Sequence, residues 1–407
     1  MERVLREVVE TLAPLDRTPC SSGERAAALW LAERLRAVGT GPVTIEQESS
    51  WGPFPRNAAL VGALGTAASL AALRGRRAAA AALAAVSIGG LVDEAQNGPR
   101  VLRRLTRRRR RTANVLAHAG DGEAVETLVV IAHHDAPQTG LIFDQTLLKR
   151  AWERNPERLA RAKRSLPQWW VGLGAPLGAV LSVLLRRRAT AGLGALLGAA
   201  GTVLAIDMWR SPTVAGANDN LSGVAVLVAL ADMLAAGPPR GLRVLLVSCG
   251  AEETLQDGIR GFLARHRESL DPARTVFLNL DTVGSPHLIM LEGEGPIWME
   301  RYAGPWLRDL VAQTAERLGI ALERGFLARS STDSVIPSRA GYPTATIVSI
   351  TDWRAPANYH LPSDVPENLD YGSVVDAARL AHGLIDALAA RGRGVVDPSS
   401  SPAPLPT

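Results

Sequence analysis

Residues 243–253, RVLLVSCGAEE, form an apolar run rich in leucine and valine that stops at two adjacent glutamates. Such a run is typical of a buried strand in a parallel sheet, because helices cover both faces of that strand. Open α/β sheets bind their ligands beyond the carboxyl ends of the strands. We therefore expect Glu252 and Glu253 to face a cleft.

Acids and imidazoles also stand at the ends of other predicted elements. An isolated pair of glutamates is ordinarily a solvated turn, so the interpretation depends on what accompanies it. Four further clusters are found: His133 with His134 and Asp135, then Asp219, Asp281 and His360. Their shared position at element ends predicts that they form one site.

Composition limits the class of protein. The chain has 407 residues, of which 47% are hydrophobic and 21% charged. These values are typical of a globular protein with one large or two medium domains. The two cysteines, Cys20 and Cys249, lie far apart, which argues against a disulfide framework and a cysteine-rich metal site. Cys249 lies within the apolar run, so we expect it to serve in packing.

The net charge of +5 raises the question of an anionic partner. Much of the excess is arginine, in short runs beside apolar segments at 74–77, 103–111 and 186–188. These runs do not line an aromatic-studded groove, which a binder of single-stranded nucleic acid would require. We therefore predict no nucleic-acid partner and favour a membrane.

A first apolar helical hairpin is predicted from residues 58–73 and 78–92, joined by the turn RGRR. Both segments are rich in alanine and glycine and are shorter than the roughly 20 residues of a spanning helix. A membrane hairpin and a soluble helical hairpin therefore both stay open for this pair.

A second hairpin is predicted from residues 171–185 and 189–206, again around an arginine turn. Trp169, Trp170 and Trp209 lie at the ends opposite that turn, where interfacial aromatic anchors are found. The alternative is a buried helix pair with ordinary core tryptophans. Membrane association is accordingly expected through two regions, 58–92 and 169–209.

The topology of these hairpins predicts where the site lies. Residues 1–14 have no apolar h-region and no small-residue cleavage site, so no secretory signal peptide is predicted. An even number of spans puts both termini and every site segment on one side. The positive-inside rule predicts that this side is cytoplasmic. The arginines of the two turns oppose insertion, because they would have to cross the membrane. The alternative is a soluble cytoplasmic protein. The basic residues on the predicted cytoplasmic side are the run 103–111, Lys149, Arg150, Lys163 and Arg164.

Strand and helix patterns alternate along the rest of the chain, which predicts an α/β fold. We expect a mixed, largely parallel central sheet flanked by helices, with two inserted apolar helical hairpins. The predicted strands are 43–48, 115–118, 128–132, 244–248, 275–281, 288–291 and 344–349, with 115–118 and 128–132 adjacent. The main predicted helices are 221–234, 299–318 and 373–391, together with an earlier one that Ser21 or Ser22 caps and that Gly39 ends. The predicted parts are the main domain at 1–56, 112–135 and 215–391, the first hairpin with its basic run at 57–111, the second insertion at 136–214, and a disordered tail at 392–407.

The clusters suit a metal site. Imidazole and carboxylate ligands without cysteine suit zinc, cobalt or manganese in a catalytic site that keeps a position open for water. Five candidate ligands exceed the need of one tetrahedral ion, whereas two ions sharing a bridging carboxylate would use them all. A second glutamate beside a ligand can then act as general base.

In their order and their flanking elements, these motifs resemble the di-zinc aminopeptidase family, which includes bacterial secreted aminopeptidases, glutamate carboxypeptidase and the transferrin-receptor ectodomain. The resemblance covers residues 112–135 and 215–391, and more loosely 1–50. It implies a zinc metallopeptidase with two zinc ions per chain, most simply an aminopeptidase acting on peptides.

The resemblance also implies the metal ligands. These are His133, Asp219, Glu253, Asp281 and His360. His133 and Asp281 would bind one zinc ion, Glu253 and His360 would bind the other, and Asp219 would bridge the two ions.

The same resemblance implies three catalytic roles. Asp135 would accept the ring N–H of His133 and so set its tautomer. Glu252 would take a proton from a metal-bridging water and return it to the leaving amine. Tyr359 would help to hold the tetrahedral oxyanion, with a packing role as its alternative.

Three further side chains have open roles. His134 competes with His133 as a ligand, but the spacing to Asp135 favours His133. Asp333 and Asp364 are each expected either as carboxylates supporting the site or as turn caps. The insertion at 136–214 departs from the family, in which a short connection is usual at this place. It puts the second hairpin at the rim of the site, where the hairpin would form either a membrane surface or a lid.

Other functions stay open beside the aminopeptidase. Carboxypeptidase or dipeptidase action uses the same metal site, which alone does not choose the peptide end. A single-zinc acyltransferase similar to glutaminyl cyclases and a catalytically silent membrane-tethered binding module are the alternatives from other classes. The presence of every predicted ligand and of Glu252 argues against the silent module. The sequence does not determine the oligomeric state.

Overall fold

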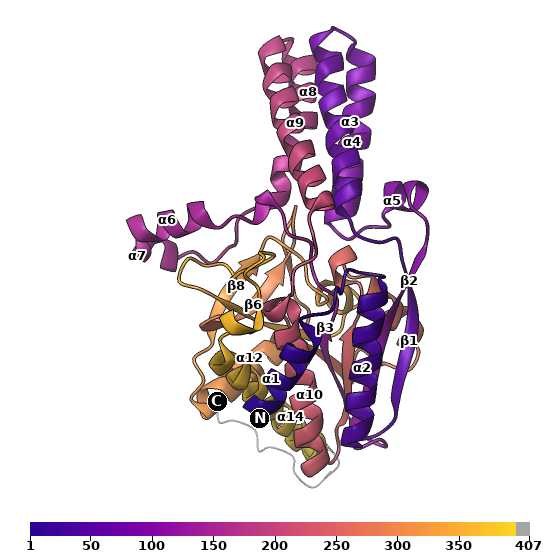
Figure 1. Ribbon diagram of the computed structural model, residues 1–407, viewed down its shortest axis with the longest axis vertical. Coiled ribbons are helices and arrows are strands. Elements are labelled where there is room, and N and C mark those ends of the chain that lie inside the picture. Colours follow the sequence, from indigo (N-terminus) through magenta and orange to yellow (C-terminus); the bar gives the residue numbers. More distant parts are fainter. Residues whose placement is uncertain (396–407) are drawn as a thin grey trace, which may run out of the picture.

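The computed structural model describes residues 1–395, with side chains placed through Arg391. In these residues the chain forms a nine-stranded mixed sheet (Figure 1), in the order β1-β2-β4-β3-β5-β9-β6-β7, with β8 paired to β6. The pairs β4–β3, β3–β5, β5–β9 and β6–β8 are parallel, and the other pairs are antiparallel. The strands are β1 (Val43–Ser50), β2 (Arg110–Gly120), β3 (Thr127–His133), β4 (Arg243–Cys249), β5 (Thr275–Leu280), β6 (His287–Glu294), β7 (Glu300–Arg301), β8 (Glu323–Ala328) and β9 (Thr344–Ile350).

Helices cover both faces of the sheet, and together with it they form what we call the body. One face carries α1 (Glu2–Leu12), α2 (Ser22–Val38), α10 (Ser222–Ala236), α12 (Pro305–Leu318) and α14 (Tyr371–Val395). The other carries α11 (Asp257–His266) and α13 (Val335–Arg339). Because side chains alternate along a strand, Val130 packs on the first face and Val129 on the second, and both are fully buried. All seven residues of β3 are buried, which explains the continuous apolar run of that strand.

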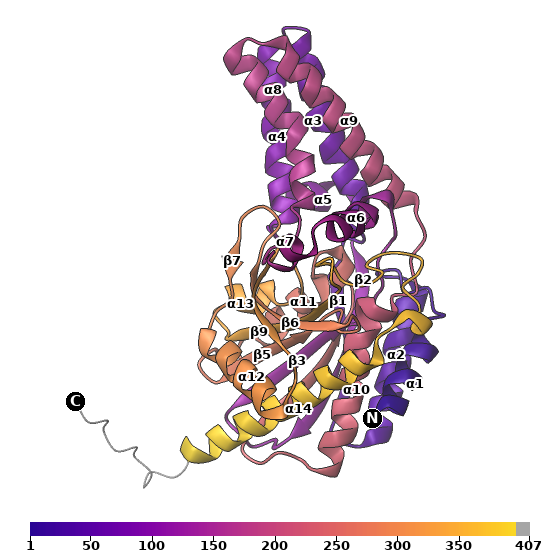
Figure 2. The ribbon, with the colours of Figure 1, turned by 90° about the vertical axis from the view of Figure 1, so that its left-hand side faces the viewer.

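Four helices leave the body and form a long antiparallel bundle (Figures 1 and 2). They are α3 (Pro55–Leu73), α4 (Arg77–Ala95), α8 (Gly174–Leu185) and α9 (Arg188–Arg210). The two predicted hairpins thus exist and pack against each other, with α3 against α9 and α8. Both arginine turns lie at the far tip of the bundle. Three short helices lie near its base: α5 (Val101–Thr106), α6 (Thr146–Arg154) and α7 (Pro156–Ala160).

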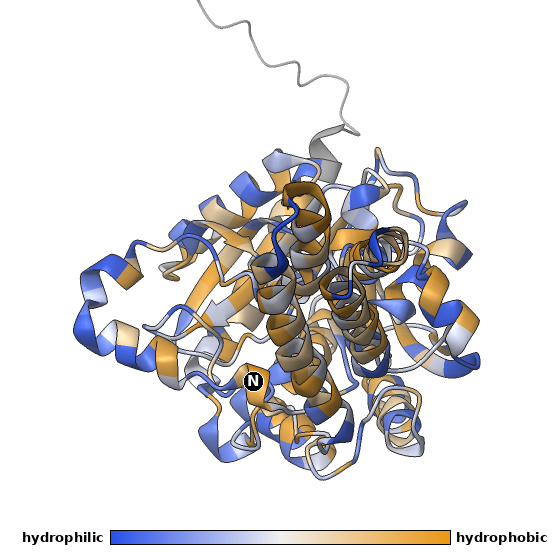
Figure 3. Cartoon of the chain, turned by 90° about the horizontal axis from the view of Figure 1, so that it is seen from above, coloured by the Kyte–Doolittle hydropathy of each residue, from blue (hydrophilic) through white to orange (hydrophobic). Residues whose placement is uncertain are grey.

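The bundle has small residues inside and large apolar residues outside. Its buried positions are mainly alanine, glycine and serine, and Gly178 of α8 lies so close to α9 that an added Cβ would be 2.6 Å from the Cα of Gly194. Leu184, Leu196 and Val203 are 70%, 68% and 61% exposed. Seen from above, the helices are largely apolar around their circumference (Figure 3). This distribution is the opposite of that in a water-soluble bundle.

The structure corrects several sequence predictions. The strands predicted at 115–118 and 128–132 are not adjacent, because β4 lies between β2 and β3. The helix predicted to start at residue 299 begins at Pro305, since β7 occupies 300–301. α14 continues to Val395, past its predicted end at 391, and the rest of the predicted tail, 396–407, lies outside the described residues.

Candidate metal centre

Three neighbouring strands deliver site residues to one edge of the sheet. His133 is the last residue of β3, and Asp281 directly follows β5. β4 is parallel to its neighbour β3, and the turn Glu252–Thr254 follows the end of β4. Because β3, β4 and β5 are parallel, their carboxyl ends lie side by side, which brings these residues together.

Asp219 lies at the centre of the site. It comes from the turn Ala217–Leu221 before α10, and His360 comes from the loop after β9. Asp219 Oδ1 lies 3.2 Å from His133 Nε2, and Asp219 Oδ2 lies 3.1 Å from His360 Nε2. Glu253 Oε1 lies 3.6 Å from His360 Nε2. The two oxygens of Asp219 thus face two different imidazoles, as a bridging carboxylate requires.

Asp135 fixes the two glutamates. It accepts the backbone N–H of Glu252 on Oδ1 and that of Glu253 on Oδ2, each at 3.0 Å. The same Oδ1 lies 3.4 Å from His133 Nδ1, which is longer than an ordinary hydrogen bond. Asp135 therefore positions the turn after β4 more tightly than it holds the ring of His133.

The turn that carries Glu252 has an unusual backbone. Ala251, Leu255 and Gln256 have φ of 52°, 69° and 67°, which is rare for residues with a side chain. Backbone of this kind costs free energy and persists only where neighbouring groups hold it. Glu24 of α2 accepts the N–H of Ala251 at 2.8 Å, and Gln256 Nε2 donates to Glu252 Oε1 at 2.6 Å.

The sequence interpretation missed Glu24 and Gln256. Glu24 stands three residues after the helix cap Ser21, so its position is explained locally as a capping residue. Only the tertiary structure shows that its carboxylate also accepts N–H and O–H groups from Ala251 and Thr112. Gln256 lies four residues after Glu252, in a segment without a recognisable motif.

Asp364 supports the central aspartate. Its carboxylate accepts the backbone N–H of Asn218 at 2.7 Å and that of Asp219 at 3.1 Å. Of its two predicted roles, the structure therefore shows the supporting one. Asp333 is also buried beside the site, and neither of its carboxyl oxygens has a hydrogen-bond partner. Burial raises the pKa of the Asp333 carboxyl to about 7.

Two other predicted positions are now placed. His134 is fully buried, and its Nδ1 lies 2.9 Å from Ser248 Oγ, so it packs behind the site rather than facing Asp219. The ring of Tyr359 packs on that of His360 with centroids 4.0 Å apart. Tyr359 also lines a cavity of about 240 Å³, which we call the metal cleft. Five predicted site residues line the same cleft: His133, Asp219, Glu252, Glu253 and Asp281.

The carboxyl groups are crowded in a buried space. Burial raises the pKa of Glu252 and of Glu253 well above the ordinary range. Burial and the neighbouring Asp219 also raise the pKa of Asp281 to about 7, while His133 lowers it. Burial alone would lower the pKa of His133, but the neighbouring carboxylates of Asp135 and Asp219 raise it well above its usual value. The site thus holds more carboxyl groups than its imidazoles can pair with, and crowding favours their protonated forms when no cation is bound.

A divalent cation fits this donor set. His133, Asp219 and Glu253 offer ligand atoms that all lie within 4.8 Å of one another. His360 Nε2 is buried 3.1 Å from a carboxylate oxygen, yet the contact lacks the geometry of a hydrogen bond. A cation between the two atoms would use both lone pairs. Imidazole and carboxylate are ligands that zinc, cobalt and manganese accept.

A buried ion pair ties the site to the bundle. Arg103 is fully buried, and its Nε donates to Glu94 Oε1 at 2.6 Å, near the end of α4. Arg103 Nη1 also donates to the carbonyl of Thr254 at 2.5 Å, in the turn that carries Glu252. The other oxygen of Glu94 accepts Asn57 Nδ2 at 2.8 Å. Arg103, which the sequence analysis counted among the basic residues beside the hairpins, is therefore buried and neutralised by Glu94.

The chain resembles known proteins in part of its sequence and in its fold. Residues 201–385 match peptidase family M28. Among curated protein sequences, none matches this chain. The fold resembles LapB from Legionella pneumophila (TM-score 0.56, 12% identity), with 96% of this chain and 72% of that chain covered. It also resembles an aminopeptidase from Aneurinibacillus sp. strain AM-1 (TM-score 0.55, 14% identity), with 95% of this chain and 93% of that chain covered. A third similar structure is a Fimbriiglobus ruber glutaminyl cyclase (TM-score 0.55, 15% identity), with 95% of each chain covered. At these identities the structures establish the fold alone.

Proposed function

We propose that this chain is a two-zinc aminopeptidase whose bundle anchors it in a membrane. Residues 201–385 match peptidase family M28, and the fold resembles that of an aminopeptidase. The family match and the donor set support a metal-dependent peptidase. The number of ions, the identity of the metal, the end of the peptide that is read and the membrane anchor are the proposal.

The observation that carries the proposal is the position of Asp219. Its two oxygens lie 3.2 Å and 3.1 Å from the imidazoles of His133 and His360, so one carboxylate can serve two ions. Glu253 lies on the His360 side, and Asp281 lines the same cleft. The excess of carboxylates favours a substrate with a free amino terminus, because a carboxylate oxygen attracts an ammonium group.

The roles of the other residues follow from their positions. When bound, the metal ions would polarise the scissile carbonyl and make water a stronger acid. Glu252 would then accept a proton from the attacking water and pass it to the leaving amine, and its raised pKa suits both transfers. Gln256 holds the Glu252 carboxylate, and Asp135 holds the backbone behind it. Tyr359 would meet the oxyanion from the side of the cleft.

The membrane anchor is supported by the surface of the bundle. Within residues 1–395, five helices are long and apolar enough to cross a membrane by length and composition. One of them, Ala217–Ala236, which contains α10, is 78% buried within the body, whereas those of the bundle are only 22–44% buried. α3 and α4 have 19 residues each, about 28 Å of helix, which approaches the ~30 Å core of a bilayer.

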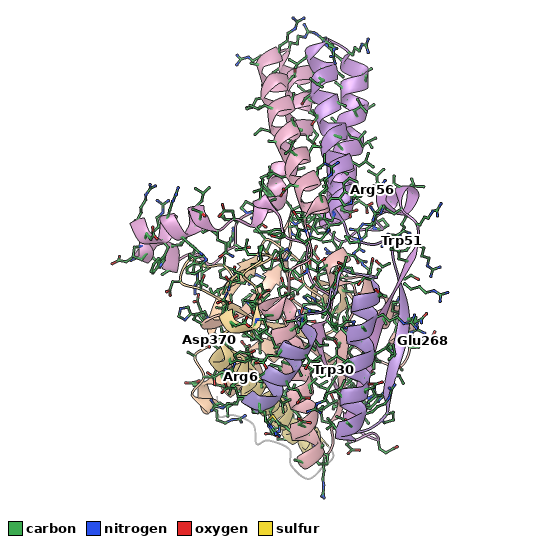
Figure 4. All side chains as sticks on the ribbon, viewed as in Figure 1. Arg6, Trp30, Trp51, Arg56, Glu268 and Asp370 are labelled. Atoms are coloured by element: carbon green, nitrogen blue, oxygen red, sulfur yellow. The ribbon has the colours of Figure 1, made fainter. Side chains whose placement is uncertain are left out.

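The base of the bundle has the side chains of a membrane interface. Arg56 lies over the ring of Trp209 at 5.4 Å, and Arg104 lies over Trp51 at 4.7 Å. Figure 4 places Trp51 and Arg56 at this level. Tryptophan and arginine are common at the boundary between lipid and water. The basic segments beside the base favour a cytoplasmic position for the body.

The experiment is the metal content of the purified protein. Elemental analysis should find two zinc ions per chain in the wild type and a sharp loss in Asp219→Ala. The wild type should also release the first residue of unblocked peptides. One zinc ion without hydrolysis would favour the acyltransferase, and no bound metal would favour the silent binding module. Release from the carboxyl end instead would retain the metal site and overturn the aminopeptidase assignment.

A further inference from the structure

A second cavity joins the metal centre to the bundle. It has a volume of about 160 Å³, and Glu252, Glu253 and His360 line one of its ends. The remaining wall is mostly apolar, and much of it comes from the two insertions rather than from the body. It includes Phe54, Leu91, Trp169, Leu197, Leu204 and Met208. We call this space the bundle cavity.

The bundle cavity is elongated. Leu197 and Met208 both line it and are 11 positions apart on α9, which corresponds to about 16 Å along the helix. That length exceeds the reach of one side chain, while each residue of an extended peptide covers about 3.3–3.6 Å. The cavity therefore suits a stretch of chain with apolar side chains. A charged side chain would lose its hydration there without gaining a partner.

The catalytic carboxylates lie where the two spaces meet. Glu252 and Glu253 line both the metal cleft and the bundle cavity. A peptide whose scissile bond lies at Glu252 therefore has one arm in each space. An aminopeptidase holds a single residue before the scissile bond and the whole remaining chain after it, so the elongated cavity matches the arm after the bond.

We propose that the bundle cavity binds the apolar residues that follow the scissile bond. The substrate class is then peptides with large apolar side chains at their second and third positions, presented from the face where the bundle meets the body. This inference rests on the proposed peptidase function. The outer surface of α9, with exposed Leu193 and Leu196, would lie in the same lipid from which such a peptide approaches.

Two glycines of α9 give a matched test. Gly201 lines the bundle cavity, and an added Cβ there would meet no atom within 4 Å, so Gly201→Phe would project into the cavity. Gly192 on the same helix has equally open surroundings, but it does not line the cavity. Gly192→Phe therefore controls for adding an aromatic ring to α9.

The experiment compares two peptides that share their first residue, Leu-Phe-Leu-Gly and Leu-Ser-Ser-Gly, with the full chain in lipid nanodiscs. We expect kcat/KM of the wild type to favour the apolar peptide at least tenfold. Gly201→Phe should lower this ratio at least tenfold, mainly through KM, and Gly192→Phe should keep it. Calorimetry measures Kd for both peptides with the same glycine substitutions, each combined with Glu252→Gln. Gly201→Phe should remove the tighter binding of the apolar peptide, and Gly192→Phe should keep it.

The outcomes separate the two proposals. Equal kcat/KM for both peptides, or a ratio that Gly201→Phe leaves unchanged, overturns the cavity assignment while the peptidase stands. Hydrolysis of neither peptide by the zinc-loaded wild type overturns the peptidase, and the Kd values then still test the cavity. A phospholipid that stays with the wild type through purification but not with Gly201→Phe, with equal Kd for both peptides, would make the cavity a lipid site and overturn the inference.

Discussion

The body and the bundle bury opposite kinds of residue. In the body, helix α10 is buried along most of its length, and its inside positions are valine, leucine and alanine. In the bundle, the inside positions of α8 and α9 are mainly glycine and alanine, while leucines such as Leu184 and Leu196 face outward. Both regions are helical and apolar, so composition alone does not separate them.

The proposed membrane anchor accounts for this difference. Water drives large apolar side chains into a core, because their burial removes apolar area from water. Lipid gives no such drive, so helices in a bilayer associate through close backbone packing, which small residues permit. The contrast supports a body folded in water and a bundle folded in lipid, and the following variants test that division.

The largest expected effect is on the rate of peptide hydrolysis, because the proposed catalytic residues lie in the body. Glu252→Gln removes the proposed general base but keeps an oxygen that can accept from Gln256. We expect peptide hydrolysis to fall by about 10³-fold, within the usual range for general acid–base groups. Bound metal and membrane fractionation, measured in parallel, should stay as in the wild type. Loss of metal in this variant would instead make Glu252 a ligand.

A pair of leucine substitutions tests the two environments directly. Leu230 of α10 is fully buried in the body, whereas Leu196 of α9 is 68% exposed. Leu230→Ala should lower the free energy of unfolding by about 2–5 kcal/mol. Leu196→Ala should change it by less than about 0.5 kcal/mol. Denaturant titrations in mild detergent give both values, and equal losses would mean that protein covers the outside of the bundle.

A pair of glycine substitutions tests the inside of the bundle. A Cβ at Gly178 would lie 2.6 Å from Gly194 Cα and 2.8 Å from Thr190 O, so Gly178→Leu must push α8 from α9. Overpacking typically costs about 1–3 kcal/mol. Gly192→Leu, with open surroundings, is the control. The midpoint temperature of thermal unfolding in detergent should drop for Gly178→Leu only. Equal midpoints for the two variants would show that the helices are not tightly packed at Gly178.

The last comparison concerns pH. The body buries acidic side chains, whereas the interior of the bundle between its helices is mostly alanine, glycine and serine. Burial raises the pKa of Glu294 to about 8, and its carboxylate accepts the N–H of Thr332 at 2.9 Å. The folded state keeps this proton between about pH 4.5 and 8, where the unfolded state releases it, so stability falls as pH rises through that window.

Glu294→Gln should flatten that decline, because the amide stays neutral and can still accept from Thr332. Thermal melts between pH 5 and 8 measure the slope, with the exposed acid substitution Glu316→Gln on α12 as control. A slope that Glu294→Gln leaves unaltered would assign the pH dependence to other buried acids, of which Asp364, with a pKa raised to about 7, is one.

The predicted site was largely accessible from the sequence because the polar residues interrupt apolar runs at strand ends. His133, Asp281 and the Glu252–Glu253 pair each follow a buried strand, and parallel strands must bring such ends to one edge. Asp219 and His360 come from a turn and a loop, where spacing carries less information. Their assignment as ligands depended on the family resemblance, and the structure places Asp219 between His133 and His360.

Other features had no local signal. The backbone of Ala251 is held by Glu24 across 227 positions of sequence, and no periodicity encodes such a contact. Arg103 stands in a basic run but pairs with Glu94 inside the protein. The place of β4 between β2 and β3 is likewise a matter of long-range pairing, which local patterns do not specify.

The sequence by itself determined the element types, the two apolar hairpins and the chemical character of the site, because these depend on short-range periodicity and on which residues end each run. Only the tertiary structure decided that the hairpins join into one bundle, that the bundle has its large side chains outside, and that a cavity runs from Glu252 to α9. Those properties arise from contacts between segments far apart in the chain, where the packing of complete surfaces decides what is buried.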